Sequence, residues 1–289
     1  MGAKAILRTL EMSGIIGLPG WGDIHLTANG NRLWVRRIAG ETDRTAVLLL
    51  HGWSASADLN WRTTYGHLDG YQVIAPDHPG HGHSPVDDTM FSLEDCADSY
   101  AELARRWGIA TLIPVGYSMG GPIAMLMARR HPDLVSGVVL AATAAHFGRN
   151  AFERTALRYV GALGRVSRDV LHAAETHGHL EGNRYVTLAE KLSEIAEAGT
   201  GLAGFDARGW LDLLDVPVVQ LCTSKDHLVP LADQLETACA LNAATRRVDA
   251  DHDAALVHPG FGRVVREAVE TILAVGYTPA RAPALAGAL

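Results

Sequence analysis

Short apolar runs recur along the chain, and several of the segments between them carry apolar residues at helical spacing. A continuous apolar run bounded by turn residues is typical of a parallel strand buried on both faces. Helical spacing predicts helices that pack one face against such strands. The strands predicted in this way are residues 45–50, 71–75, 112–117, 135–145, 216–222 and 245–249.

An antiparallel hairpin is predicted before the first buried run. Residues 24–27 and 33–38 have strand character and flank Asn29-Gly30, a dipeptide typical of tight hairpin turns. A helix is predicted from Leu93 to about residue 107, because Ser92 and the acidic residues after it form a start signal and Gly108 ends the pattern. Further helices are expected at 119–130 and 262–274. The alternation of strand and helix predicts an α/β fold with a doubly wound, mostly parallel sheet.

One strand is followed by a segment with an unusual combination of residues. Gly116-Tyr117-Ser118-Met119-Gly120 joins the strand at 112–117 to the helix that follows. A serine on so sharp a turn requires flanking residues without a Cβ atom, because strand and helix pass close to it on both sides. The free N–H groups at the start of the helix also favour developing negative charge. The pattern therefore indicates a nucleophile elbow with Ser118 as the nucleophile.

With this elbow, the sequence from about Asn29 to Ala274 resembles the α/β-hydrolase superfamily, in its cap-bearing serine esterase and lipase-like branch. The alternation of strand and helix breaks between residues 146 and 210, where helical patterns at 151–160, 166–176 and 185–198 are interrupted by glycines. The resemblance implies that this stretch is a small helical cap over the site. The expected division is an N-terminal extension 1–22, a hydrolase core 23–145 and 211–276, a cap 146–210 and a flexible tail 277–289.

The resemblance also assigns the oxyanion hole. His51-Gly52-Trp53 follows the strand at 45–50 and matches the family's His-Gly-x turn. Family members pair the backbone N–H of x with that of the residue after the nucleophile, which implies Trp53 and Met119. Two fixed donors of this kind stabilise a tetrahedral oxyanion.

The resemblance places the acid of a catalytic triad after the strand at 216–222. Asp226, with Val229 and Pro230, matches the family's Asp-x-x-Val-Pro spacing, whereas Asp215 and Asp233 are less well placed. The carboxylate would hold the histidine in the correct tautomer and stabilise its charged form.

The base is expected in the loop after the strand at 245–249. His252 fits the family's arrangement with Pro259, although Asp251 stands where the family has glycine, and His258 is the alternative base. The order Ser118, Asp226, His252 along the chain is the order of this fold.

A cluster of histidines after the strand at 71–75 suggests a metal site as an alternative. His78, His81 and His83 lie close to Asp77, and imidazoles with a carboxylate can bind zinc. The family has an Asp-x-x-Gly-x-Gly-x-Ser turn here, which Asp77, Gly80, Gly82 and Ser84 match. We therefore interpret the histidines as part of a structural turn, and those in the predicted cap, His172, His177 and His179, as cap surface. No metal or cofactor is implied.

Composition narrows the function further. Apolar residues make up 48% of the 289-residue chain and charged residues 20%, as in an ordinary globular protein. A net charge of -7 argues against nucleic acid or an anionic membrane as a partner. The three cysteines, Cys96, Cys222 and Cys239, show no disulfide or metal pattern and are interpreted as buried small residues. We find no signal peptide and no run long enough to span a bilayer, so a cytoplasmic location is expected.

The sequence thus predicts a serine hydrolase that cleaves small-molecule carboxylic esters through an acyl-enzyme. A cofactor-free haloperoxidase or perhydrolase is an alternative, since His51-Gly52-Trp53 resembles that group's turn, although Ser54 replaces its proline. A lactonase or carbon–carbon hydrolase could use the same triad, and a ligand-binding receptor on a hydrolase body is the non-enzymatic alternative. Whether the chain forms a homo-oligomer stays open.

Overall fold

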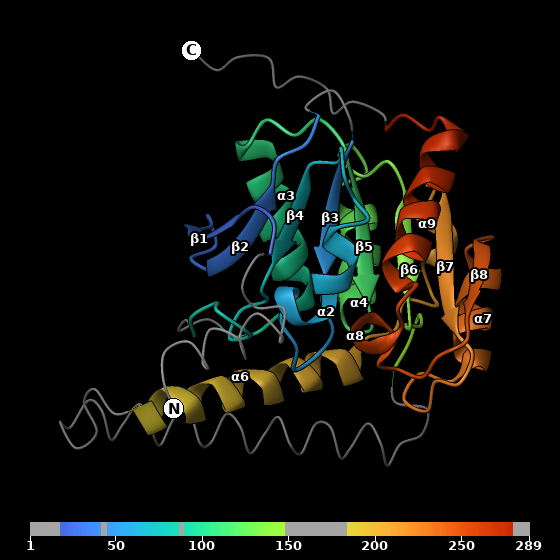
Figure 1. Ribbon diagram of the computed structural model, residues 1–289. Coiled ribbons are helices and arrows are strands. Elements are labelled where there is room, and N and C mark those ends of the chain that lie inside the picture. Colours follow the sequence, from blue (N-terminus) through green and yellow to red (C-terminus); the bar gives the residue numbers. More distant parts are fainter. Residues whose placement is uncertain (1–17, 42–44, 87–89, 148–183, 280–289) are drawn as a thin grey trace.

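The computed structural model describes residues 18–41, 45–86, 90–147 and 184–279. One eight-stranded sheet runs through these residues in the order β1-β2-β4-β3-β5-β6-β7-β8 (Figure 1). The strands are β1 (Trp21–Leu26), β2 (Arg32–Ile38), β3 (Ala46–Leu50), β4 (Val73–Pro76), β5 (Leu112–Tyr117), β6 (Val138–Ala141), β7 (Val218–Thr223) and β8 (Ala244–Val248).

The sheet is mostly parallel, as the sequence predicts. β1 and β2 form the expected antiparallel hairpin, with Ile24 opposite Trp34, and β2 is also antiparallel to β4. All other neighbouring strands in the sheet are parallel. Their carboxyl ends therefore lie at one edge of the sheet, where ligands bind in open α/β sheets.

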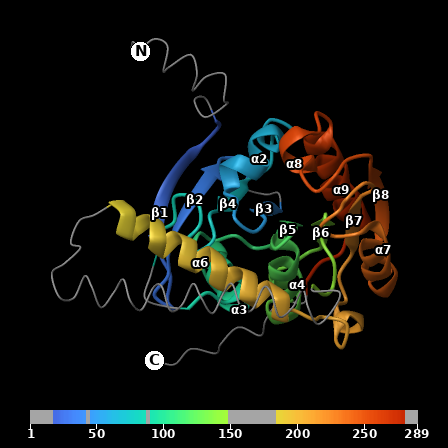
Figure 2. The same cartoon turned by 90° about the horizontal axis from the view of Figure 1, so that it is seen from below.

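Helices cover both faces of the sheet (Figures 1 and 2). Figure 2 shows α3 and α4 on one side of the sheet and α2, α8 and α9 on the other. The helices are α2 (Ala57–Tyr65), α3 (Leu93–Arg106), α4 (Gly120–Arg130), α6 (Arg184–Gly204), α7 (Leu231–Ala240), α8 (Ala254–Val257) and α9 (Phe261–Val275), with a 3-10 turn η1 (Leu211–Leu213). This arrangement confirms the doubly wound α/β class.

The central strand β3 shows how the sequence produces two cores. All its residues are buried. Val47 and Leu49 belong to the hydrophobic cluster beneath α2 and α9, whereas Leu48 and Leu50 belong to the cluster beneath α3 and α4. Because successive side chains of a strand point to opposite faces, an uninterrupted apolar run suits a strand covered on both sides.

One helix does not lie on a face of the sheet. α6 runs across the edge formed by the carboxyl ends of the central strands (Figure 1), and it falls within the predicted cap. The predicted helices at 151–160 and 166–176, the cap histidines, most of the N-terminal extension and the tail from residue 280 lie outside the described residues. The division into a core and a cap therefore stays a proposal.

Several local predictions differ from the structure. The helix α2 was not expected, because its buried face mixes Ala57, Trp61 and Tyr65 with the polar residues Asn60 and Thr64. Its start is stabilised by Ser56, whose side chain accepts a hydrogen bond from the Leu59 N–H. The strand predicted at 135–145 is confined to β6. Cys96 and Cys222 are buried but Cys239 is exposed, so the interpretation of all three cysteines as buried is wrong for that residue. Across the described ranges, we find no helix that is both long and apolar enough to span a membrane.

The close approach of β3 and α4 gives a testable prediction. A Cβ atom on Gly120 would lie 2.2 Å from the Leu50 carbonyl oxygen, so the backbone would have to move. We expect Gly120→Ala to lower the free energy of unfolding by about 3 kcal/mol, as overpacking does in close-packed cores. Urea denaturation followed by circular dichroism measures this. Gly66→Ala is the matched control, because a Cβ there meets nothing within 4 Å; equal losses in both variants would contradict the prediction.

Candidate active site

Ser118 stands on a strained turn at the carboxyl end of β5. Its φ angle is 51°, in the left-handed region that few residues other than glycine adopt. Three hydrogen bonds hold it there. Its N–H donates to the Ala141 carbonyl at 2.9 Å, while its own carbonyl accepts from the Thr143 hydroxyl at 2.7 Å and the Gly121 N–H at 2.9 Å. The strand β5, the neighbouring β6 and the start of α4 thus all fix the predicted elbow.

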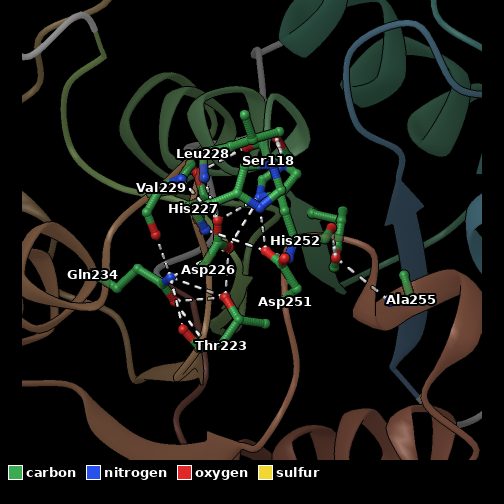
Figure 3. Close-up of polar contacts among 12 residues, drawn as sticks. Ser118, Thr223, Asp226, His227, Leu228, Val229, Gln234, Asp251, His252 and Ala255 are labelled. Carbon is green, nitrogen blue, oxygen red and sulfur yellow. Dashed lines mark hydrogen bonds and ion pairs between the residues drawn. The ribbon is translucent and has the colours of Figure 1, made fainter.

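The structure brings the predicted triad residues together (Figure 3). The Nε2 atom of His252 lies 3.0 Å from the Ser118 Oγ atom, and its Nδ1 atom lies 3.0 and 2.9 Å from the two Asp226 oxygens. The Asp226 side chain is fully buried and that of His252 is 16% exposed. A carboxylate can only accept, so Nδ1–H donates to Asp226 and Nε2 is left to accept the serine proton.

Several donors hold the Asp226 carboxylate in place. The N–H groups of Leu228 and Val229 donate to one oxygen, and the Thr223 hydroxyl donates to the other at 2.7 Å (Figure 3). Burial alone would raise the pKa of Asp226, but hydrogen bonds from His252, Val229 and Thr223 outweigh it and lower the pKa. Asp226 is therefore an anion at neutral pH.

Tyr117 binds the backbone of the histidine. Its hydroxyl donates to the His252 carbonyl oxygen at 2.5 Å and accepts from the Ala255 N–H at 3.4 Å. Burial raises the pKa of Tyr117, so it remains a neutral donor. In the sequence Tyr117 is only the variable position of the elbow, and its contact with a residue 135 positions away is visible only in three dimensions.

The alternative acids and base occupy other positions. Asp215 precedes β7 at the opposite end of that strand, and Asp233 lies in the first turn of α7. His258 follows α8, and its Nδ1 atom accepts from the Gly260 N–H at 3.3 Å. His252 is thus the imidazole that contacts the Ser118 hydroxyl, and Asp226 is the carboxylate that contacts this imidazole.

The turn predicted to supply the oxyanion hole lies beside the elbow. A Cβ atom on Gly52 would be 3.3 Å from the Ser118 Cβ atom, and the Gly52 N–H donates to the Asn60 side chain at 2.8 Å. Trp53 is the next residue of this turn, and Met119 follows Ser118 at the N-terminal cap of α4. Their proposed role as N–H donors stays a prediction.

The Trp53 side chain joins this turn to α6. Its indole N–H donates to the Ile195 carbonyl at 2.6 Å, and a Cβ atom on Gly199 would lie only 2.8 Å from the ring. Glycine at position 199 therefore lets the helix approach the indole. A second contact, from Lys191 Nζ to the Gly82 carbonyl at 2.6 Å, ties α6 to the turn after β4.

His78 and His81, two of the three histidines in the cluster predicted after β4, are buried together with His51, whereas His83 is exposed. The rings of His51 and His78 lie 3.9 Å apart. The His51 ring accepts from the His78 backbone N–H through Nε2, and the His78 ring donates to the His51 carbonyl. The other ring nitrogen of His78 accepts from the Tyr100 hydroxyl. The His81 ring donates to the Pro79 carbonyl. Each contact is one that a neutral imidazole makes.

Burial determines the charge of this cluster. It lowers the pKa of His78 to about 3, with a smaller contribution from His81, and it also lowers the pKa of His51 and of His81. Asp77 accepts from the N–H groups of Ala57 and His83 and from the ring Nδ1 of His83 at 3.1 Å, and these contacts hold the turn. Within the part of the chain that the structure describes, no group of three or more potential ligands is arranged around a metal position.

Comparisons with known proteins agree with this fold. Residues 45–194 match the alpha/beta hydrolase fold family. The chain is 30% identical over 228 residues to the pimeloyl-(acyl-carrier protein) methyl ester esterase of Sodalis glossinidius, covering 69% of this chain and 84% of that protein. It is 31% identical over 201 residues to the protein of the same name from Neisseria meningitidis serogroup C, covering 64% of this chain and 76% of that protein.

Solved structures resemble the chain at the level of fold. A thermophilic esterase from Thermogutta terrifontis superposes with a TM-score of 0.71 at 22% identity, over 88% of this chain and 99% of that one. The chain belongs to the α/β-hydrolase fold family. The similarity to these esterases also confirms the enzyme class predicted from the sequence, a carboxylic ester hydrolase.

The buried histidines give a prediction for stability. A histidine whose pKa is lowered on folding stabilises the protein above its unfolded pKa of about 6.5, and this contribution is lost as the pH falls toward the folded value. We expect the difference in the free energy of unfolding between wild type and His78→Gln to shrink by roughly 3 kcal/mol as the pH falls from 6.5 to 4. Each pH unit in this range contributes about 1.4 kcal/mol. Urea denaturation at both pH values measures it, and an unchanged difference would contradict it.

Proposed function

We propose that the chain hydrolyses carboxylic esters with Ser118 as nucleophile, His252 as general base and acid, and Asp226 as the carboxylate that orients the histidine. The observation that carries this proposal is the continuous contact from the Ser118 hydroxyl through the imidazole to the buried carboxylate. Within this geometry, a serine hydroxyl can lose its proton as it attacks, which a free serine cannot do at neutral pH.

The first half of the reaction makes an acyl-enzyme. Ser118 Oγ attacks the ester carbonyl carbon, and its proton moves to Nε2 of His252. The Asp226 anion stabilises the imidazolium that results. The backbone N–H groups of Trp53 and Met119 would donate to the oxyanion, and the N-terminal end of α4 favours the same negative charge. When the tetrahedral intermediate collapses, the alcohol leaves with the proton from His252.

The second half regenerates the serine. His252 takes a proton from water, the hydroxide attacks the acyl carbonyl, and the carboxylic acid leaves as the proton returns to Ser118 Oγ. In the proposed division of the chain, α6 is part of a cap that shields these steps from bulk water. Its contacts with the turns after β3 and β4 support that role.

Replacing the nucleophile tests the proposal directly. We expect Ser118→Ala to lower kcat for nitrophenyl esters by at least about ten-thousand-fold, because a triad without its nucleophile loses nearly all its contribution. Ser136→Ala is the matched control: this serine is also buried, but its hydroxyl contacts the Leu112 carbonyl at the other end of β5. It should keep wild-type activity.

Labelling separates the enzyme from the receptor alternative. A fluorophosphonate should react with wild type and with the Ser136 variant but not with Ser118→Ala. Tight binding of an ester without turnover or labelling in the wild type would favour a receptor and would sink the proposed mechanism.

The curated relatives suggest a more specific substrate. We propose a methyl ester on an acyl chain carried by a protein as the first natural substrate to test, since the relatives at 30% and 31% identity are named for such an ester. Contacts with the carrier would supply binding energy that a free methyl ester lacks. We therefore expect kcat/KM for methanol release to be at least about ten-fold higher with the carrier-bound ester than with the free one. Equal values would show that the carrier is not recognised.

A further inference from the structure

Two loops carry the acid and the base of the proposed triad, and they run side by side. The loop after β7 contains Asp226, and the loop after β8 contains His252. Parallel pairing of the strands continues briefly into the loops, where the Ser224 N–H donates to the Val248 carbonyl and the Lys225 N–H to the Ala250 carbonyl. Beyond these bonds, side chains join the two loops.

One carboxylate oxygen connects the immediate neighbours of the acid and the base (Figure 3). Asp251 Oδ1 accepts from the His252 N–H at 2.6 Å, from the His227 N–H at 3.2 Å and from the His227 ring Nδ1 at 2.5 Å. Asp251 precedes His252 in the chain, and His227 follows Asp226. The carboxylate therefore spans the two loops next to the His252–Asp226 contact.

We infer that Asp251 and His227 form a clasp, defined by these three hydrogen bonds, that positions the His252 imidazole against Asp226 for catalysis. This inference rests on the proposed function. Neither residue contacts the Ser118 hydroxyl, so both are positioning residues. The glycine that stands before the histidine in the resembling family could not make this link, because it has no side chain.

The clasp matters because the reacting distances are short. Proton transfer from Ser118 requires the imidazole to keep hydrogen-bond distance to the hydroxyl and to Asp226 at once. Misplacement by about 1 Å can cost a hundred-fold in rate. Tyr117 independently binds the His252 carbonyl, so removing the clasp should loosen the base rather than release it. Because the base stays partly restrained, we expect kcat to fall roughly ten-fold.

The same loops contain a matched control. Asp249 accepts from the Ser224 hydroxyl and from Lys225 Nζ, each at 3.0 Å, so it also bridges the loops. Its partners lie one and two residues before Asp226 and contact neither member of the acid–base pair. Both bridges are on the surface, with side-chain exposures of 67% and 45% for His227 and Asp251 and 64% for both Lys225 and Asp249. They therefore differ in position rather than burial.

The test compares Asp251→Ala with Asp249→Ala in nitrophenyl ester hydrolysis. We expect Asp251→Ala to lower kcat roughly ten-fold with KM within two-fold of wild type, because the clasp acts on the base and not on substrate binding. Asp249→Ala should keep kcat within about two-fold. Asp251→Asn keeps the acceptor oxygen and should restore much of the rate.

A double variant shows whether the two residues act together. Asp251→Ala with His227→Ala should be no slower than Asp251→Ala alone, since residues of one network are not additive. Melting temperatures of the Asp251 and Asp249 variants should agree within about 2 °C, which separates positioning from loss of fold. Equal kcat in the two aspartate variants, or an effect confined to KM, would overturn the clasp. Activity retained by Ser118→Ala would instead overturn the proposed function.

Discussion

The left-handed backbone of Ser118 is the constraint on which the rest of the site depends. A side chain in this region of φ is unfavourable by itself, so the surrounding structure must hold it. Here β5 delivers the serine, the Ala141 carbonyl and the Thr143 hydroxyl bind its peptide groups, and α4 starts at once. These contacts project the hydroxyl beyond the carboxyl edge of the sheet, toward the loops that follow β7 and β8.

Parallel strand order turns distant segments of sequence into neighbours. Ser118 and His252 are 134 residues apart, yet their side chains meet because β5, β6, β7 and β8 are consecutive in the sheet and all end at one edge. The segments after β5, β7 and β8 then each contribute one residue of the proposed triad. The network around Asp226 shows that the supporting contacts, from Thr223 and from backbone N–H groups, are as local as the motif itself.

What could be predicted from the sequence was what local patterns encode. Buried strands appear as apolar runs, and the positions of Ser118, Asp226 and His252 follow from short motifs at strand ends. The helix α2 was missed because it is short and polar residues, Asn60 and Thr64, share its buried face with the apolar ones. The roles of Tyr117 and His227 could not be predicted for another reason. Their partners, His252 and Asp251, are distant in the sequence and come near only on folding. Asp251 was visible as a departure from the family pattern, but its partner was not.

The Trp53 side chain links α6 to the turn that is proposed to supply an oxyanion donor. Its indole is bound to α6 and packed against Gly199, while its backbone belongs to the turn beside Ser118. A side chain at position 199 would push on the ring, and through it on the turn proposed to supply one of the oxyanion donors. The packing of α6 and the geometry of the proposed oxyanion donor are therefore linked through one side chain.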